Sequence, residues 1–462
     1  MEYINVRKQY PVFYYHDFAI IESDWEFHVQ FDFEIEGLSH FNPDFILPKP
    51  KNSGTYANLR TVREAAFSLG LIELISYWKL TCSPRVVIEC GSLSAEQTAW
   101  WKKLYYRGLE EFFYTNHIDA DPDTFIDLCA CGEPCTGQID QRRFSGNLIP
   151  VGGGKDSFVT LKLLSGMKEE NHIFIINHMM AAVHSALAAG YQGESLIIAE
   201  RTLDSRMLEF NKMGFFNGHT PFSALTAFAS SLTAVIYGIQ NIVLSNEASA
   251  NEPTIKDSRI NHQYSKSFEF ENDFKWYMDS FITPEVHYFS LLRPLSELQI
   301  AGMFSTLKEY HPVFRSCNVG KNEERWCGQC AKCLFVCVIL SAYLSDAELL
   351  RIFGRDILND AQLQPLLDQL TGIAENKPFE CVGTREEVNT AIAMSIKNHE
   401  AAGEPIPLLY RNYMNTSFYD SYRGKQVDWN QYNSENLVPE NYACLLKQYI
   451  SEISENEHTS ME

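Results

Sequence analysis

The chain has 462 residues, which is too long for one ordinary hydrophobic core and indicates two or three domains. Hydrophobic residues make up 45% of the chain and aromatic residues 13%, so it is expected to fold and not to be intrinsically disordered. The formal net charge of −21 argues against a protein that binds nucleic-acid backbones, because such binding requires a basic surface.

Two further features bear on where the protein works. The first residues contain no apolar signal segment, and the longest apolar run, residues 334–344, is too short to span a bilayer. Twelve cysteines suit free thiols and a metal site in a reducing compartment better than they suit disulfides. We therefore expect a soluble, cytoplasmic protein that does not act at a membrane. The sequence leaves the oligomeric state open.

Residues 1–145 are predicted to form a mixed α/β domain. Apolar and polar residues alternate over residues 29–36, which is typical of a half-buried strand. Residues 60–79 have the composition of a largely buried helix. Ser94 and Gln97 have the spacing of a capping box, so a further helix is expected to begin there.

A glycine-rich turn follows the apolar run at residues 148–151 and precedes a helix-like segment. It reads Gly-Gly-Gly-Lys-Asp-Ser over residues 152–157. Glycines let the backbone turn sharply and approach a phosphate, and the free N–H groups at the start of the helix point at the anion. Gly152, Gly153, Gly154 and Ser157 are expected to hold the nucleotide phosphates. Lys155 and Asp156 are expected to neutralise them, directly and through Mg²⁺.

This motif differs from the Walker loop, which needs four residues between its glycines and then Gly-Lys-Ser/Thr. It resembles the PP-loop of ATP pyrophosphatases, whose core reads Ser-Gly-Gly-x-Asp-Ser and which cleave ATP to AMP and pyrophosphate. Gly152 stands where that pattern has its first serine, so one hydroxyl contact is missing. The resemblance implies a parallel-sheet PP-loop (HUP-like) domain over residues 146–315. A glycine-rich turn that binds nothing is the alternative.

From residue 148 onward, short apolar strands alternate with helices, which predicts a parallel sheet covered on both faces. Further strands are expected at residues 172–176, 195–199 and 241–245, and a long apolar helix at residues 222–237. Ligands of such sheets bind beyond the carboxyl ends of the strands. The loops that follow these strands are therefore expected to meet at one site.

Polar residues in and after these loops are the candidates for binding and catalysis. Arg201 and Arg206 are suited to the anionic groups of a substrate, with a surface charge as the equally weighted alternative. His219 is a candidate for proton transfer or nucleotide contact, with a satisfied polar residue as the alternative. Asn246 and Glu247 are expected at the nucleotide. A basic run that suits a diphosphate, or else a solvated helix face, comprises Lys256, Arg259, His262 and Lys266.

Four cysteines have the spacing Cys-x9-Cys-x2-Cys-x2-Cys, which suits a tetrahedral metal site. They are Cys317, Cys327, Cys330 and Cys333. A structural zinc site over residues 316–345 is the prediction, and an iron–sulfur cluster and free thiols are the alternatives. Residues 346–462 are predicted to form a helical region that ends in an acidic tail.

Several longer stretches sharpen the resemblance. They are residues 70–79, 199–204, 218–223, 244–252 and 326–335, together with residues 152–157. With these motifs the chain resembles the bacterial UDP-N-acetyl-alpha-D-muramoyl-L-alanyl-L-glutamate epimerases from about residue 10 to about residue 440. The resemblance implies epimerisation of the terminal L-glutamate through adenylation of its carboxylate. It also implies consumption of ATP, a requirement for Mg²⁺, release of AMP and pyrophosphate, and a small-molecule substrate used in peptidoglycan synthesis.

The residue that moves the proton is not identified by the sequence. Cys129, Cys131, Cys135, His219 and His262 are all candidates, because a thiol or an imidazole with a suitable pKa can act as a base. The alternative function is that of another PP-loop enzyme that forms a nitrile or an amide, such as a 7-cyano-7-deazaguanine synthase. A similar four-cysteine zinc site follows the PP-loop domain in those synthases.

Overall fold

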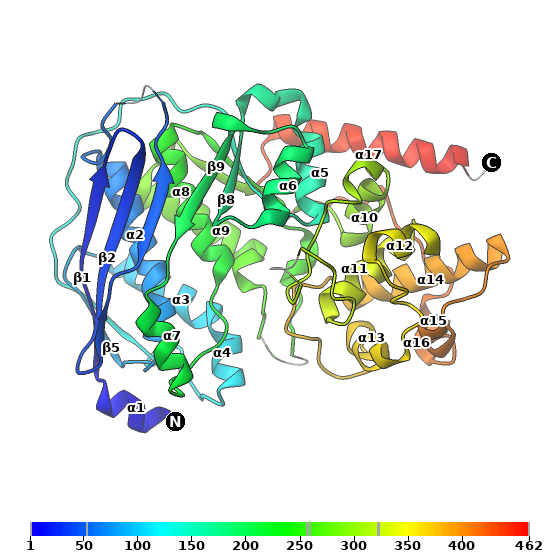
Figure 1. The fold of residues 1–462 in the computed structure, drawn as a ribbon, viewed down its shortest axis with the longest axis horizontal. Coiled ribbons are helices and arrows are strands. Elements are labelled where there is room, and N and C mark those ends of the chain that lie inside the picture. The colour runs from blue at the N-terminus through cyan, green and yellow to red at the C-terminus, as the bar shows by residue number, and fades with distance from the viewer. Residues whose placement is uncertain (1, 52–53, 256–257, 259, 321–323, 461–462) are drawn as a thin grey trace.

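The computed structural model describes residues 2–51, 54–255, 258, 260–320 and 324–460. Its centre is a sheet of eleven strands that runs through the amino-terminal two thirds of the chain (Figure 1). Most of the helices after residue 330 lie together beside it. Among the described residues, no helix combines the length and the apolar character that crossing a bilayer requires.

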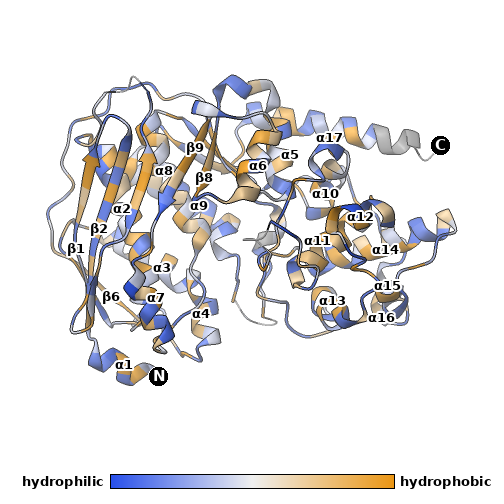
Figure 2. Ribbon diagram, viewed as in Figure 1, coloured by the Kyte–Doolittle hydropathy of each residue, from blue (hydrophilic) through white to orange (hydrophobic). Residues whose placement is uncertain are grey.

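The first half of the sheet is mostly antiparallel. Its strands are β1 (Val12–Glu22), β2 (Glu26–Ile35), β3 (Ser39–Phe41), β4 (Asp44–Pro48), β5 (Arg85–Ile88) and β6 (Asp127–Ala130). β2 pairs with β1, β3 and β4, and the parallel strands β5 and β6 extend the sheet beyond β1. Buried and partly exposed residues alternate along β2, as the sequence predicts for residues 29–36. Figure 2 shows this alternation as hydrophobic and hydrophilic bands along β1 and β2.

The second half of the sheet is parallel. Its strands are β7 (Asn147–Pro150), β8 (Asn171–Ile176), β9 (Leu196–Arg201), β10 (Asn241–Leu244) and β11 (His287–Ser290). They lie in the order β11-β10-β7-β8-β9, so the chain winds outward from β7 in both directions. This is a doubly wound arrangement with its switch point at β7.

The two halves form one continuous sheet. β4 pairs antiparallel with β9, where Phe45 and Ile46 lie opposite Arg201 and Glu200. The boundary placed near residue 145 by the sequence therefore does not interrupt the sheet. The α/β class and the helical carboxy-terminal region are confirmed, but the sheet as a whole is mixed, because β4 joins an antiparallel part to a parallel one.

Helices cover both faces of the parallel strands. Along β8, Ile173 and Ile175 enter one hydrophobic core, and Phe174 and Ile176 enter the other. Successive side chains of a strand point to opposite faces, so a strand that is apolar at every position must be covered on both sides. The helices of the sheet region are α1 (Tyr3–Gln9), α2 (Arg60–Trp78), α3 (Ala95–Gly108), α4 (Glu110–Thr115), α5 (Lys155–Leu163), α6 (Met180–Ala188), α7 (Ser205–Lys212), α8 (Phe222–Tyr237), α9 (Phe268–Tyr277) and α10 (Glu297–Ser305).

The carboxy-terminal region is helical, as predicted. It comprises α11 (Ala331–Ser341), α12 (Asp346–Phe353), α13 (Gln364–Thr371), α14 (Arg385–Ala402), α15 (Leu408–Tyr413), α16 (Ser417–Tyr422) and α17 (Glu440–Ser460). The apolar side chains of α11 share one core with α5 and α10. This shared core fixes the helical region against the parallel half of the sheet.

Candidate active site

A cavity of about 400 Å³ lies at the carboxyl ends of the parallel strands. The ends of β7, β8 and β10 contribute Pro150, Ile176 and Leu244 to its wall. β7 is the strand at which the winding direction changes, and the crevice beyond such a switch point is where open α/β sheets bind their ligands. The strand order of the sheet and the position of the cavity therefore indicate the same candidate ligand site.

The glycine-rich turn forms the floor of this cavity. Gly152, Gly154, Asp156 and Ser157 line it. Gly154 precedes α5 without any side-chain cap, which leaves the first N–H groups of the helix available to an anion. Gly153 has φ of +90°, and a Cβ there would lie 2.9 Å from the carbonyl carbon of Ala181. A glycine is required at that position because of both the backbone conformation and the close approach.

Lys155 does not line the cavity. Its ammonium group is buried and donates hydrogen bonds to the carboxylates of Asp156 and Glu297. Burial alone would lower the pKa of Lys155, but these two carboxylates hold it above its ordinary value. The structure thus places the charge of Lys155 beneath the turn, where it fixes Asp156, and not in the position of direct phosphate contact that the sequence suggested.

Asp156 and Glu297 differ in their charge. Burial raises the pKa of Glu297 to about 8, in spite of Lys155. Burial acts in the same direction on Asp156, yet Lys155, Lys332 and Lys266 lower its pKa overall. Asp156 is therefore the ionised member of this pair, and its side chain is 26% exposed. A carboxylate beside a helix N-terminus that can receive phosphate groups is a suitable ligand for Mg²⁺, which retains most of its waters.

The cavity wall is more basic than the protein as a whole. Its cationic residues are Lys266, Arg315, Arg325 and Lys332, and its carboxylates are Asp156 and Glu324. A cleft of one sign attracts a ligand of the opposite sign even when the net charge of the protein opposes it. The backbone N–H of Arg315 donates to the carbonyl of Gly153 at 2.8 Å, which fastens this wall to the glycine turn.

One side of the cavity is apolar. It is lined by Phe174, Ile176, Met179, Phe222 and Leu244. A pocket that combines an apolar wall with a few charged groups suits a ligand that has both a flat ring and anionic groups.

The two arginines predicted to bind substrate lie outside this cavity. Arg201 forms a bidentate ion pair with Glu73, with both N–O distances at 2.8 Å. Arg206 pairs with Asp204, the residue that caps α7. The sequence pattern identified two anion-binding side chains, and the fold provides each of them with an anion from the chain itself.

The ion pair of Arg201 leads to a stability prediction. The side chains of Arg201 and Glu73 are only 11% and 4% exposed, so Arg201→Ala leaves a buried carboxylate without its counter-charge. We expect a loss of about 3–5 kcal/mol of stability, measured as a fall in the urea midpoint by circular dichroism. Arg206→Ala is the control, because its side chain is 43% exposed, and its cost should be at most about 1 kcal/mol. Equal midpoints for the two variants would contradict this account.

His219 lies behind the cavity wall. Its Nδ1 is 3.3 Å from a carboxylate oxygen of Glu111, which also bonds Nδ1 of His262. Burial lowers the pKa of His219 to about 4, so it is neutral at physiological pH. Burial also opposes the charge on His262, but Cys381 and Glu111 raise its pKa to about 9. His219 and His262 thus lie around the same carboxylate oxygen of Glu111, to which His262 is hydrogen-bonded.

Of the other residues predicted in these loops, some line the cavity and others do not. Asn246 lines the cavity, but Glu247 is buried behind it and accepts a hydrogen bond from Ser249. Glu252 pairs with Lys377. Of the predicted basic run, Lys266 lines the cavity, and Lys256 and Arg259 lie outside the described residues.

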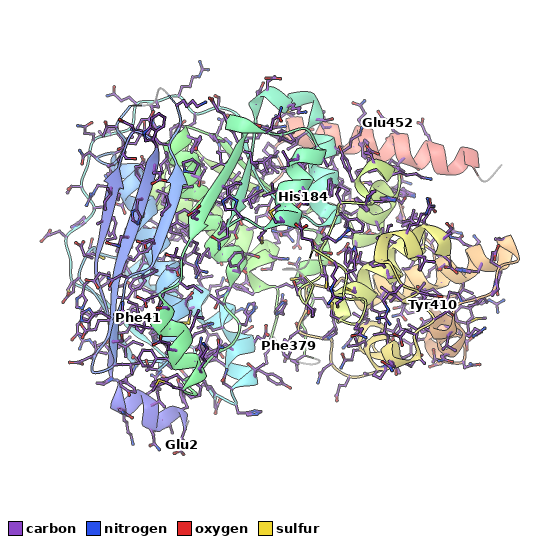
Figure 3. The ribbon with its side chains drawn as sticks, viewed as in Figure 1. Glu2, Phe41, His184, Phe379, Tyr410 and Glu452 are labelled. Atoms are coloured by element: carbon purple, nitrogen blue, oxygen red, sulfur yellow. The ribbon has the colours of Figure 1, made fainter. Side chains whose placement is uncertain are left out.

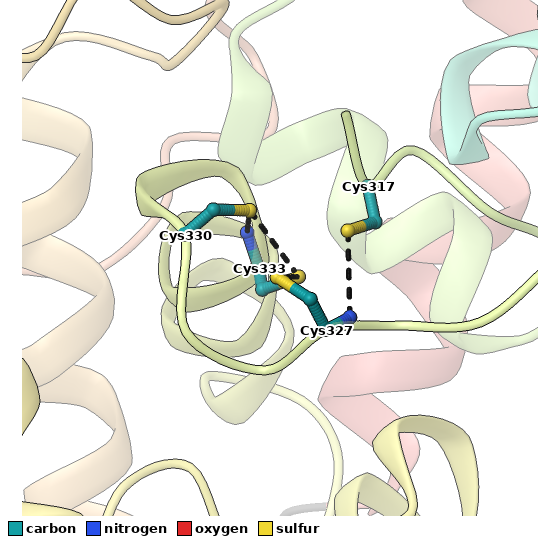
Figure 4. Close-up of side chains that lie close together, drawn as sticks. All are labelled: Cys317, Cys327, Cys330 and Cys333. Carbon is teal, nitrogen blue, oxygen red and sulfur yellow. Dashed lines mark hydrogen bonds between the residues drawn. The ribbon is translucent and has the colours of Figure 1, made fainter. Parts of the chain in front are cut away.

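The four cysteines of the predicted metal site converge (Figure 4). Each of their sulfurs lies within 4.8 Å of the others, with 3.7 Å between Cys327 and Cys333 and 3.5 Å between Cys330 and Cys333. Sulfurs bound tetrahedrally to zinc at 2.3 Å are about 3.8 Å apart, so the set fits this ion. Backbone N–H groups of Gly320 and Cys327 point at the sulfur of Cys317, as is suitable for thiolates.

The other three candidate thiols are far from the cavity in the fold. Cys129 lies on β6, which is the edge strand at the end of the sheet opposite β11. Cys131 and Cys135 follow β6 in the chain, and none of the three lines the cavity. Burial raises the pKa of Cys135 to about 12, which makes it a poor base.

Sequence reasoning missed three cationic side chains and one thiol of the cavity: Arg315, Arg325, Lys332 and Cys381. Lys332 lies within the cysteine repeat, where the spacing drew attention to the sulfurs alone. Cys381 follows the glycine turn by more than two hundred residues, and no local pattern marks it. Only the packing of the helical region against the sheet brings it to the site.

These features define the class of protein: a doubly wound α/β chain with a basic cavity at its switch point and a cluster of four cysteines beside it. The profile of the MurL N-terminal domain matches residues 4–291, and that of the MurL C-terminal domain matches residues 313–417. The chain belongs to this family.

Three curated relatives support that membership. A protein of Xanthomonas oryzae pv. oryzae (strain MAFF 311018) is 33% identical over 73% of this chain and 76% of its own length. Proteins of Micromonospora sp. (strain ATCC 39149) and Salinispora tropica are each 31% identical, over 80% and 81% of this chain and 83% and 82% of their own lengths. All three are named UDP-N-acetyl-alpha-D-muramoyl-L-alanyl-L-glutamate epimerase. No solved structure matches the chain significantly.

Proposed function

We propose that this chain converts the terminal L-glutamate of UDP-N-acetylmuramoyl-L-alanyl-L-glutamate to D-glutamate, with cleavage of ATP to AMP and pyrophosphate. The observation that carries this proposal is the coincidence of family and site. The relatives bear the name of this epimerase, and the turn that resembles a PP-loop lines a basic cavity at the switch point of the sheet. The reaction would take place in the cytoplasm, as part of peptidoglycan precursor synthesis.

The chemistry explains why ATP would be consumed. The glutamate nitrogen is already in a peptide bond, so it cannot form a Schiff base with pyridoxal phosphate. The α-proton is weakly acidic because a carboxylate anion lies next to it. Adenylation of that carboxylate removes the charge and creates an ester-like carbonyl, whose enolate can be stabilised by hydrogen-bond donors or cations. ATP cleavage would thus serve the removal of a proton.

Different residues in and below the cavity would bind the different parts of ATP and of the substrate. The N–H groups of the glycine turn and the hydroxyl of Ser157 would hold the pyrophosphate end of ATP. Asp156 would hold Mg²⁺, which neutralises phosphate charge when bound, and Lys155 would keep Asp156 in place from below. Lys266, Arg315 and Lys332 are available for the anionic groups of the two substrates. The four cysteines would hold zinc in a closed, structural site with no part in the reaction.

The reaction can be tested in deuterated water. The purified protein is incubated with ATP, Mg²⁺ and the L-glutamate substrate, and the products are analysed by chiral chromatography and mass spectrometry. We expect D-glutamate that carries one deuterium at Cα, together with AMP and pyrophosphate, because the proton that returns comes from solvent.

Two omissions serve as controls. Without ATP, neither deuterium exchange nor D-glutamate should form, and without Mg²⁺ both should fall sharply. Release of ADP and orthophosphate in place of AMP and pyrophosphate would contradict the proposed adenylation. Exchange that proceeds equally well without ATP would contradict the role of ATP altogether.

A further inference from the structure

One thiol lies at the cavity and is used by neither the glycine turn nor the zinc site. Cys381 belongs to a segment between α13 and α14 that reaches back from the helical region towards the sheet. Its near neighbour Phe379 contacts the ring of Tyr114, which belongs to α4, and Figure 3 shows Phe379 between the two masses of the molecule. Cys381 shares the cavity wall with Asp156, Lys266 and Lys332.

The backbone around Cys381 is held from both sides. Gln263 donates a hydrogen bond to the carbonyl of Val382 at 3.1 Å, and Lys332 donates to the carbonyl of Cys381 itself. On the preceding side, the backbone N–H of Lys377 donates to the carbonyl of Thr254 at 3.1 Å. The thiol therefore has a fixed place although its segment is neither helix nor strand.

The side chain of Cys381 is surrounded by cations. The Nζ of Lys266 lies 3.2 Å from its sulfur, and His262 is a second hydrogen-bond partner. His262 is in turn held by Glu111. Burial opposes ionisation of the thiol, but Lys266, His262 and Lys332 outweigh it and lower the pKa of Cys381 to about 6. The thiolate is therefore the main form at neutral pH.

The other ionisable groups of the cavity are unsuited to accept a proton. Asp156 is held by Lys155 beside the phosphate-binding turn, and Cys317 belongs to the metal site. Burial raises the pKa of Tyr288, which keeps its hydroxyl protonated. Glu324 lies 3.7 Å from Nδ1 of His184, which is a possible counter-charge. No histidine is among the described residues that line the cavity.

Building on the proposed function, we propose that Cys381 is the catalytic residue that removes the α-proton of the activated glutamyl residue. The C–H bond breaks and an S–H bond forms, and the C–H electron pair moves into the bond between Cα and the carbonyl carbon. The carbonyl π pair then resides on oxygen as an enolate, near the cations of the cavity. Lys266 and His262 act as positioning residues that keep the sulfur ionised.

The cycle closes with solvent. Water in the open cavity delivers a proton to the opposite face of Cα, and the carbonyl is restored. The hydroxide that remains takes the proton from the thiol, which returns Cys381 to the thiolate. A second water then hydrolyses the acyl-adenylate and releases AMP and the free carboxylate. The overall change at the amino acid is inversion at Cα with one solvent hydrogen incorporated, and no oxidant or reductant is needed.

The test separates proton removal from ATP cleavage. Cys381→Ser is compared with the wild type for pyrophosphate release and for deuterium incorporation in the same reaction. A serine hydroxyl has nearly the same shape but is not ionised at neutral pH. Deuterium incorporation and D-glutamate formation should therefore fall by about 10²–10⁴-fold, while pyrophosphate release stays close to that of the wild type. Cys444→Ser, at an exposed thiol on α17, is the matched control and should behave as the wild type.

The outcomes distinguish this inference from the proposed function. If the wild type releases pyrophosphate and epimerises, and Cys381→Ser epimerises equally well, Cys381 is not the base and the proposed function stands. Loss of both activities in a folded Cys381→Ser also contradicts the inference, because it assigns the thiol to nucleotide binding. If the wild type itself neither exchanges nor cleaves ATP, the proposed function fails and the inference with it.

A measurement on the wild type covers the case in which Cys381→Ser does not fold. Iodoacetamide should alkylate Cys381 faster than Cys444, and the loss of deuterium exchange should follow the modified fraction of Cys381 by mass spectrometry. Full exchange in a protein with alkylated Cys381 would overturn the inference.

The pH dependence of the deuterium exchange rate tests a catalytic role of Cys381, because a purely structural role would leave it unchanged. Lys266, His262 and Lys332 face the thiol with positive charge, and Glu111 and Glu380 are the nearby carboxylates. With a pKa of about 6, the thiolate fraction, and with it the exchange rate, should rise about tenfold between pH 5 and pH 7. Lys266→Gln removes a charge that lowers this pKa, so the rise should move to higher pH. An unmoved profile in Lys266→Gln would contradict the role given to Lys266.

Discussion

Asp156→Asn is expected to reduce pyrophosphate release by about a thousandfold or more while the fold is retained. Asparagine keeps the shape of the side chain but loses the charge that would bind Mg²⁺, and a catalytic metal contributes several kcal/mol to the stabilisation of transition-state charge. Each 1.36 kcal/mol is a factor of ten in rate. The measurement is pyrophosphate release by a coupled assay, with AMP determined by chromatography.

The core beneath the turn should tolerate this change. In Asp156→Asn, the negative charge that helps to raise the pKa of Glu297 is lost, so Glu297 can ionise and serve as the counter-charge of Lys155. The matched control is Asp346→Asn, because Asp346 also lies in the first turn of a helix, here α12, and does not line the cavity. It should release pyrophosphate at the wild-type rate. Near-normal release by Asp156→Asn would mean that the glycine turn does not hold the metal and phosphates of ATP.

A titration with Mg²⁺ separates metal binding from positioning. If Asp156 is a metal ligand, the residual activity of Asp156→Asn should need more Mg²⁺ to saturate than that of the wild type. If the carboxylate only positioned Lys155, the Mg²⁺ dependence would be unchanged and only the maximum rate would fall. The second result would show that Asp156 supports the glycine turn and does not bind the metal.

Local patterns were sufficient to predict the elements that carry the site. The apolar residues 172–176 lie on β8 with alternate side chains in two cores, and the helix predicted at residues 222–237 is found with those bounds. The capping box at Ser94 is present. In each case the determining interactions lie within a few residues of chain, so a single sequence contains them.

Long-range pairing was not predictable in the same way. The contact between β4 and β9 joins segments about 150 residues apart, and nothing in either strand specifies its neighbour. The charged residues show the same limit, since Arg201 and Lys155 were both assigned to ligands and both are satisfied by buried carboxylates of the chain. A side chain's type defines what it can bind, and only the tertiary fold decides which anion it meets.

Cys381 shows this limit most clearly. The thiols that the sequence offered as bases, Cys129, Cys131 and Cys135, were prominent because they are close together in the chain. Cys381 has no cysteine near it in the chain, and its pKa is lowered, against the effect of burial, by Lys266 and His262, which belong to the sheet region. A lowered thiol pKa is a property of the assembled site and leaves no pattern in the segment that carries the sulfur.

Loss of a ligand from the proposed zinc site is expected to have the largest effect on stability. Cys333 is fully buried in the first turn of α11, and the apolar residues of that helix belong to the core shared with α5 and α10. Structural zinc contributes about 10–16 kcal/mol of apparent binding free energy in zinc-finger peptides, so removal of one of four ligands should cost at least several kcal/mol here. Cys333→Ser should therefore unfold at a much lower temperature and carry less than one zinc per chain.

The measurements are zinc content by mass spectrometry and the thermal midpoint by circular dichroism. Cys337→Ala is the control, because Cys337 is buried one turn further along α11 and is not one of the four clustered thiols. It should keep one zinc per chain, with a loss of stability limited to the small cavity it creates. A brown protein with iron in place of zinc would identify an iron–sulfur cluster.

The metal site should also affect the cavity, because Cys317 lines both. Arg315 and Ser316 precede Cys317 on the same wall, and Arg315 is bonded to the carbonyl of Gly153. Removal of the proposed metal by a chelator should therefore weaken ATP binding before the sheet unfolds, since Arg315 and Ser316 would no longer be held through Cys317. Calorimetric titration with ATP before and after chelation measures this coupling. Unchanged affinity in a chelated, metal-free protein would show that the wall is held by its packing alone.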